Sequence, residues 1–354
     1  METLKILSEA VEQGASDIFL IPGMPYAYKV SGYIREQNDI RLSPEALKSL
    51  AAQIYEFADN RSMQRLAETG DDDFSFSIKG LSRFRANIFK QRGSYAVVLR
   101  IVNYNLPDYA QLRIPDAVMR IADMYKGLVL VTGPAGSGKS TTLSCIIDKI
   151  NNTRNAHIIT LEDPIEFLLK HKKSIVTQRE ISIDTANYGS ALRASLRQAP
   201  DVILLGELRD YETIQTAMTA AETGHLVIST LHTIGASTTV DRIIDNFPQN
   251  QQNQIKLQLS MVLQAVVSQL LIPTIDSKIT PAFEIMFLNG AIRNMIRESK
   301  NHQIDSVILS GKEQGMITMD NSLMEIYKEG RITKETLLTY STNREIMEKK
   351  LERA

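Results

Sequence analysis

Residues 128–142 read LVLVTGPAGSGKSTT, and this stretch decides the fold of the chain. Its apolar start predicts a strand, its centre matches G-x-x-x-x-G-K-[ST], and a helical run at 141–150 follows. In that setting glycines let backbone N–H groups turn towards a phosphate, Lys139 reaches its β- and γ-oxygens, and Ser140 can ligate Mg²⁺. A glycine turn used only for packing would not need Lys139 and Ser140 there. We therefore predict an ATP and Mg²⁺ site formed by Gly133, Pro134, Ala135, Gly136, Ser137, Gly138, Lys139, Ser140, Thr141 and Thr142.

The sequence around this loop has the alternating strand and helix pattern of an α/β fold. Turns and helical patterns follow a series of apolar runs, which lie at 128–132, 158–161, 202–205 and 226–230. This order predicts a mostly parallel sheet covered by helices. The last hundred residues predict mainly helix, including a core-facing helix over 255–270, where apolar residues recur at helical spacing. Residues 117–354 are thus expected to form one P-loop domain with a helical C-terminal part.

The region before this domain predicts a smaller α+β domain over residues 1–103. Two helical patterns alternate there with short strands, and a hairpin over 83–102 turns near Arg92-Gly93. Residues 104–116 contain turn residues with little periodicity, so we place the linker there.

The composition of the chain excludes several classes of protein. The chain has 354 residues, 40 Lys+Arg, 41 Asp+Glu and a formal net charge of −1, so no strong field favours nucleic acid. The single cysteine, Cys145, excludes an internal disulfide and a multi-cysteine zinc site and fits a reducing compartment. We see no signal peptide and no run of about 18 apolar residues. A cytoplasmic protein that does not bind nucleic acid is expected.

Two strands end in carboxylates near the expected phosphate loop. Residues 201–207 read DVILLGE, and residues 158–166 read IITLEDPIE. One acid would hold the Mg²⁺ shell, and the other would orient and deprotonate the attacking water. An acid at a strand end also serves as a helix cap or a solvated turn, which is the alternative for both.

Two histidines, His225 and His232, bracket the strand at 226–231. Polar strand ends beside a phosphate site can sense the loss of a γ-phosphate. A structural role is the ordinary alternative, and a zinc site is a weaker one because no cysteine is nearby.

The hairpin in the first domain carries a separate prediction. With the turn centred on Arg92-Gly93, Arg85 lies opposite Arg100, and like charges in that position destabilise a sheet. An anion over this face would explain the pair, so we expect Arg85 and Arg100 to reach a nucleotide phosphate, in cis or across subunits. The alternatives are a solvated basic face, or a register slipped by two residues that removes the pairing.

Taken together, four motifs resemble the secretion ATPases of the type II and type IV systems. In the family's order they are GPAGSGKSTT at 133–142, LEDPIEF at 161–167, GELRD at 206–210 and AETGH through TLHT at 221–233. The resemblance implies a hexameric ring with a PAS-like N-terminal domain and a RecA-like motor domain. It implies that Glu166 is the general base, that Glu207 is the magnesium-side acid acting through water, and that His225 and His232 sense the γ-phosphate.

Residues 291–298, AIRNMIRE, resemble a helix typical of the family's pilus retraction branch. The long N-terminal extension and four-cysteine insert of assembly ATPases are missing, whereas Phe19 and the segment 196–201 depart from the family pattern. The implied partners are further copies of the chain in a homohexamer, a polytopic inner-membrane platform protein and an accessory retraction ATPase. The implied location is the cytoplasmic face of the inner membrane. Pilus assembly, type II secretion, accessory retraction, a nucleotide-gated structural ring and a DNA motor are the alternatives.

Overall fold

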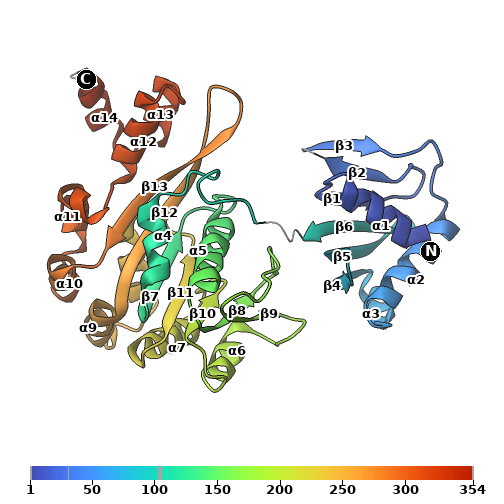
Figure 1. Ribbon diagram of the computed structural model, residues 1–354, viewed down its shortest axis with the longest axis horizontal. Helices are drawn as coiled ribbons and strands as arrows, with labels where there is room; N and C mark the ends of the chain where they lie inside the picture. The colour runs from blue at the N-terminus through green and yellow to red at the C-terminus, as the bar shows by residue number, and fades with distance from the viewer. Residues whose placement is uncertain (1, 31, 103–105, 353–354) are drawn as a thin grey trace. The chain divides into compact units, whose positions relative to one another are not determined.

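The computed structural model describes residues 2–30, 32–102 and 106–352, and it divides the chain into two compact units (Figure 1). The first unit contains the elements α1 to β6, and the second contains α4 to α14. Residues 103–105, where the linker was expected to begin, lie outside the described part. From Leu106 onward the predicted linker belongs to the second unit, where Ile114 is buried in the core.

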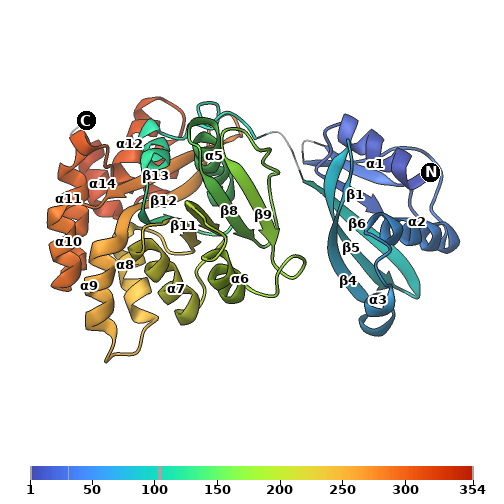
Figure 2. The same ribbon diagram turned by 60° about the horizontal axis from the view of Figure 1, so that its bottom comes forward.

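The first unit is a six-stranded antiparallel sheet with helices packed on one face (Figure 2). The sheet order is β3-β2-β1-β6-β5-β4. The strands are β1 Asp17–Leu20, β2 Ala27–Val30, β3 Tyr33–Glu36, β4 Asp71–Ile78, β5 Ser82–Gln91 and β6 Ser94–Val102. The helices are α1 Glu2–Glu12, α2 Pro44–Phe57 and α3 Gln64–Thr69. Helix α2 begins after Ser43, whose hydroxyl accepts a hydrogen bond from the Ala46 N–H, and Pro44 occupies the first turn.

The hairpin between β5 and β6 has the register predicted from its turn. Arg92 and Gly93 both have positive φ, 49° and 79°, as a two-residue hairpin turn of this hand requires. Arg85 lies directly opposite Arg100. Alternate residues of β5 are buried, so the arginines point away from the core on the other face of the sheet.

The second unit is built on a seven-stranded sheet in the order β13-β12-β7-β11-β10-β8-β9. All pairs are parallel except β12 with β13. The strands are β7 Gly127–Thr132, β8 His157–Glu162, β9 Ile175–Glu180, β10 Val202–Leu205, β11 Leu226–Leu231, β12 Leu263–Pro273 and β13 Ile279–Phe287. All four strands expected from the sequence are present.

The expected helix over 255–270 is wrong in its second half. Helix α9, Gln252–Val262, ends where β12 begins, and β12 runs between β7 and β13. A continuous apolar run fits a buried strand as well as a buried helix, and here pairing with two strands decides the outcome. The C-terminal part is therefore less helical than predicted.

Helices cover both faces of this sheet. One face carries a core formed with α6 Tyr188–Ser195, α7 Tyr211–Glu222, α8 Ala236–Asp245 and α9, and the other a core formed with α4 Asp116–Met119 and α5 Lys139–Thr153. The chain continues through α10 Gly290–Arg297, α11 Ile304–Ser310, α12 Met319–Lys328, α13 Lys334–Tyr340 and α14 Arg344–Leu351, with short 3-10 turns at Arg120–Asp123, Asn301–Gln303 and Lys312–Gln314. Among the described residues, no helix is both long and apolar enough to cross a bilayer.

Candidate active site

The candidate site lies at the carboxyl-terminal edge of the parallel sheet. The register pairs Leu231 of β11 with Thr132 of β7, and Leu205 of β10 with Leu161 of β8. The segments that follow these four strands therefore leave the sheet along the same edge. They include the phosphate loop, the LEDPIEF and GELRD motifs and the TLHT end of the fourth motif.

The phosphate loop has the backbone that its glycines predict. Gly133, Gly136 and Gly138 have positive φ of 140°, 77° and 85°. A Cβ on Gly133 would lie 2.2 Å from the backbone oxygen of Gln269 on β12, so only glycine fits there. The loop opens directly into helix α5, whose first turn presents N–H groups to a bound anion.

The side chain of Lys139 is hydrogen-bonded to the backbone of this loop. Its ammonium donates hydrogen bonds to the backbone oxygens of Gly133 at 2.8 Å and Pro134 at 2.9 Å. The residue is buried, and burial lowers the pKa of its ammonium. The Ser137 hydroxyl is also buried and has no hydrogen-bond partner. A phosphate in the loop would supply acceptors for both groups, so the residues present fit a nucleotide.

The metal part of the prediction rests on Ser140 and Glu207. Ser140 is exposed in the first turn of α5, where its hydroxyl can reach a metal held by a bound nucleotide. Glu207 follows β10, and its carboxylate pairs with Arg209 and lies 3.2 Å from Nε2 of His232. Hydroxyl and carboxylate oxygens are the ligands that Mg²⁺ takes in sites of this kind.

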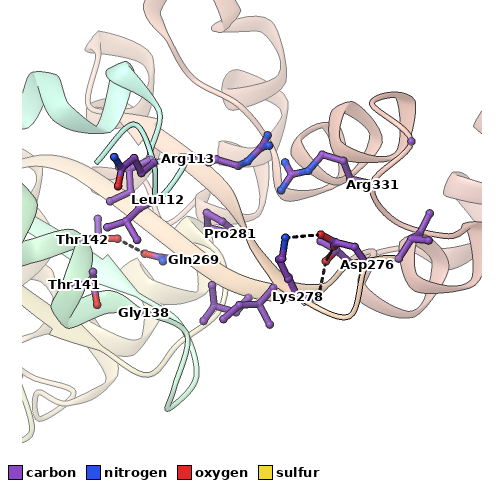
Figure 3. Close-up of a pocket in the computed structure, with 17 residues that line it drawn as sticks. Leu112, Arg113, Gly138, Thr141, Thr142, Gln269, Asp276, Lys278, Pro281 and Arg331 are labelled. Carbon is purple, nitrogen blue, oxygen red and sulfur yellow. Dashed lines mark hydrogen bonds and ion pairs between the residues drawn. The ribbon is translucent and has the colours of Figure 1, made fainter. Parts of the chain in front are cut away.

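A cavity of about 790 Å³ adjoins the loop on the side of Gly138, Thr141 and Thr142 (Figure 3). Its walls come from residues 111–114, from β12 and β13 with their connecting turn, and from Gly330 and Arg331. Because a nucleotide extends from its phosphates into such a mixed pocket, this cavity can hold the nucleoside. These wall residues were not predicted from the sequence, because they lie far from any motif.

His232 is the histidine that belongs to this edge. It follows β11, and burial together with the charges of Lys139 and Arg209 lowers the pKa of its imidazole. A neutral ring can both donate and accept a hydrogen bond. His232 can thus contact a γ-phosphate while bonded to Glu207.

His225 lies apart from this edge within one chain, and its role as a γ-phosphate sensor stays an untested prediction. His225 precedes β11, at the opposite edge of the sheet, and its Nδ1 lies 2.9 Å from the backbone oxygen of Ala220. Seven residue steps along the extended strand separate it from His232, roughly 23 Å. The two histidines of one chain therefore do not meet at one phosphate or one zinc ion.

The LEDPIEF motif at 161–167 contains two glutamates, Glu162 and Glu166, that differ in exposure. Glu162 accepts hydrogen bonds from Thr160 and Gln178, whereas Glu166 lies beyond the strand and is exposed. The Asp163–Pro164 peptide bond between them is cis. The role of general base for Glu166 stays a prediction.

The arginine pair is present, but its explanation changes. Arg85 forms two hydrogen bonds to Asp73, at 3.1 and 2.8 Å, and Arg100 forms one to Asp17, at 3.1 Å. Carboxylates on the flanking strands β4 and β1 thus supply the anions that the like-charge pair needs. The inference that a nucleotide must lie over this face loses its basis, and nucleotide contact by Arg85 and Arg100 stays an untested prediction.

The matches to known proteins agree with this architecture. A family model described as "Type II/IV secretion system protein" matches residues 2–351, and the chain belongs to this family. The chain is 43% identical over 335 residues to the type IV pilus retraction ATPase PilT of Pseudomonas aeruginosa, covering 95% of this chain and 96% of that one.

Two further matches extend the comparison. The chain is 38% identical to the type IV pilus ATPase PilU of the same organism, covering 96% of this chain and 89% of PilU. The crystal structure of the pilus retraction motor PilT with bound ADP superposes with a TM-score of 0.89 at 48% identity, with 99% of each chain covered. The predicted two-part fold, an N-terminal domain and a RecA-like ATPase domain, is confirmed.

Proposed function

We propose that this chain is a motor ATPase that hydrolyses ATP to power type IV pilus retraction. One observation carries the proposal: a phosphate loop, Glu207 and His232 share one sheet edge in a chain that matches a retraction ATPase over 95% of its length. The motor would work as a homohexamer on an inner-membrane platform protein, at the cytoplasmic face of that membrane.

In this proposal each residue acts through position and charge. Lys139 exchanges its two backbone acceptors for β- and γ-phosphate oxygens, and Ser137 and the N–H groups of α5 complete the cradle. Ser140, and Glu207 through water, would hold Mg²⁺, which neutralises charge on the phosphates when bound. Glu166 would take the proton of the attacking water, and His232 would contact the γ-phosphate.

The direction of work is tested in cells. Deletion of the gene should leave abundant pili that do not retract, together with a loss of twitching motility. Bare cells would show an assembly or secretion motor instead. Retained twitching with weakened retraction force would show an accessory retraction ATPase, which is the second candidate.

The chemistry is tested on the purified protein. Steady-state hydrolysis of ATP that needs Mg²⁺ separates a motor from a nucleotide-gated structural ring, which would bind ATP without turnover. Stimulation of hydrolysis by DNA at physiological salt would point to a DNA motor. A Lys139→Ala protein that hydrolyses ATP at the wild-type rate would overturn the site assignment.

A further inference from the structure

A buried carboxylate behind the candidate site is unused by the chemistry described so far. Glu284 lies on β13 and is 7% exposed. Its Oε1 accepts a hydrogen bond of 2.7 Å from the N–H of Ala236, and its Oε2 accepts one of 3.4 Å from the N–H of Met319. These two amides begin helices α8 and α12, so one side chain holds two helix N-termini.

The first of these contacts fixes the loop that carries His232. Only Thr233, Ile234 and Gly235 separate His232 from Ala236, and α8 has no side-chain cap of its own. Glu284, which lies on β13, acts as the cap of α8. Its negative charge also interacts favourably with the positive end of the helix dipole.

A second acceptor reinforces this hold. Ser268 is the cross-strand partner of Glu284, and its hydroxyl accepts a 3.0 Å hydrogen bond from the N–H of Gly235. Consecutive amides of the loop are thus bound by one pair of residues on β12 and β13. The neighbouring Gln269 accepts a 2.7 Å bond from Thr142, so β12 also touches the helix of the phosphate loop.

The second contact of Glu284 reaches the C-terminal helices. Ile285 exchanges backbone hydrogen bonds of 2.8 and 3.1 Å with Ile317, two residues before α12. Met319 then adds the bond to Glu284. A shift of the His232 loop on loss of the γ-phosphate would therefore change the support of α12 through a single carboxylate.

We propose that Glu284 is a positioning residue that places His232 for hydrolysis and joins its loop to α12. This inference rests on the proposed ATPase function. Neither role requires Glu284 to touch the nucleotide, so the residue should affect the rate of hydrolysis more than the binding of ATP.

The test compares Glu284→Gln with wild type in the full-length chain. Glutamine keeps the volume and one acceptor oxygen but presents an NH₂ group to the other amide. We expect kcat to fall about tenfold with KM for ATP within twofold, because one charged hydrogen bond is lost behind the site. Ser268→Ala, which loosens only the loop, should lower kcat about threefold and serves if Glu284→Gln folds poorly.

A matched control and a double mutant separate positioning from general stability. Thr333 caps α13, where its hydroxyl accepts a hydrogen bond from the Thr336 N–H, so Thr333→Ala should leave kcat within twofold. In a His232→Ala background, Glu284→Gln should cause no further loss, because it acts through His232. An equal further loss there, or an unchanged kcat in Glu284→Gln alone, would overturn the proposal. Absence of hydrolysis by the wild type would instead overturn the ATPase function on which it rests.

Discussion

The two ends of strand β11 differ in what they offer, although a histidine stands at each. At the carboxyl end His232 contacts Glu207, close to the phosphate loop. At the amino end His225 bonds to Ala220, and the neighbouring Glu222 accepts a hydrogen bond from Gln258 of α9. The first histidine faces groups that a nucleotide can engage, and the second holds the turn after α7.

This difference follows from the parallel sheet. Each crossover helix returns the chain to the amino edge, so loops after the strands gather at one edge and loops before them at the other. The motif with two histidines therefore spans both edges. Only the part of this motif that follows β11 lies at the edge with the phosphate loop.

The largest contrast is expected for lysines on helix α5. Lys139→Ala removes the cation of the phosphate loop and should lower kcat/KM by about 10² to 10³ fold, the size typical of losing one pre-oriented donor. Lys149 on the same helix bonds to the backbone oxygen of Met119, and Lys149→Ala should stay within threefold. Steady-state kinetics of both variants measure the contrast. Equal losses would show that charge on α5, and not the loop geometry, matters.

A glycine at each edge gives the next contrast. Gly133→Ala places a Cβ 2.2 Å from a backbone oxygen and should cost about 2 kcal/mol of stability, together with nucleotide binding. Gly224, at the amino edge, also has positive φ but open space around it, so Gly224→Ala should cost about 1 kcal/mol and leave binding intact. Denaturant unfolding and nucleotide titration test both. A larger cost at Gly224 would mean that φ outweighs the close contact.

The histidines themselves come third. His232→Ala should lower kcat about tenfold, because a hydrogen bond that forms near the γ-phosphate is lost. His225→Ala should change kcat by less than twofold and act only on stability. If His225→Ala matched His232→Ala in the assembled protein, a neighbouring subunit would have to bring His225 to the site.

The smallest effect is a dependence of stability on pH. Because the folded pKa of His232 lies below the unfolded value of about 6.5, the unfolded chain binds the extra proton between the two values. Stability should therefore rise with pH through that window, and His232→Gln should remove a small part of the rise. Urea unfolding of both proteins across this range measures it. A steeper rise in His232→Gln would contradict the lowered pKa.

The local structural features of this molecule could be predicted from its sequence. The phosphate loop, the cap at Ser43 and the turn at Arg92-Gly93 each depend on residues within a few positions of one another. Their glycines, prolines and hydroxyls act on the nearest backbone, so spacing is enough to predict them.

The features that the sequence did not predict depend on contacts between residues far apart in the chain. Gln269 and Glu284 support the site from strands that the sequence presented as part of a mainly helical region. Asp17 and Asp73 neutralise the arginine pair from β1 and β4, which no hairpin argument includes. The edge on which His225 falls became visible only once the strand directions were known.

The two hydrogen bonds that Lys139 makes to its own loop have a consequence for product release. The loop carbonyls compete with the ligand for one ammonium group, so a ligand holds the lysine only while it offers better acceptors. When hydrolysis removes the terminal phosphate, the number of such acceptors falls, and the lysine can return to Gly133 and Pro134. The two loop carbonyls thus compete with the shortened nucleotide for Lys139 and favour departure of that nucleotide.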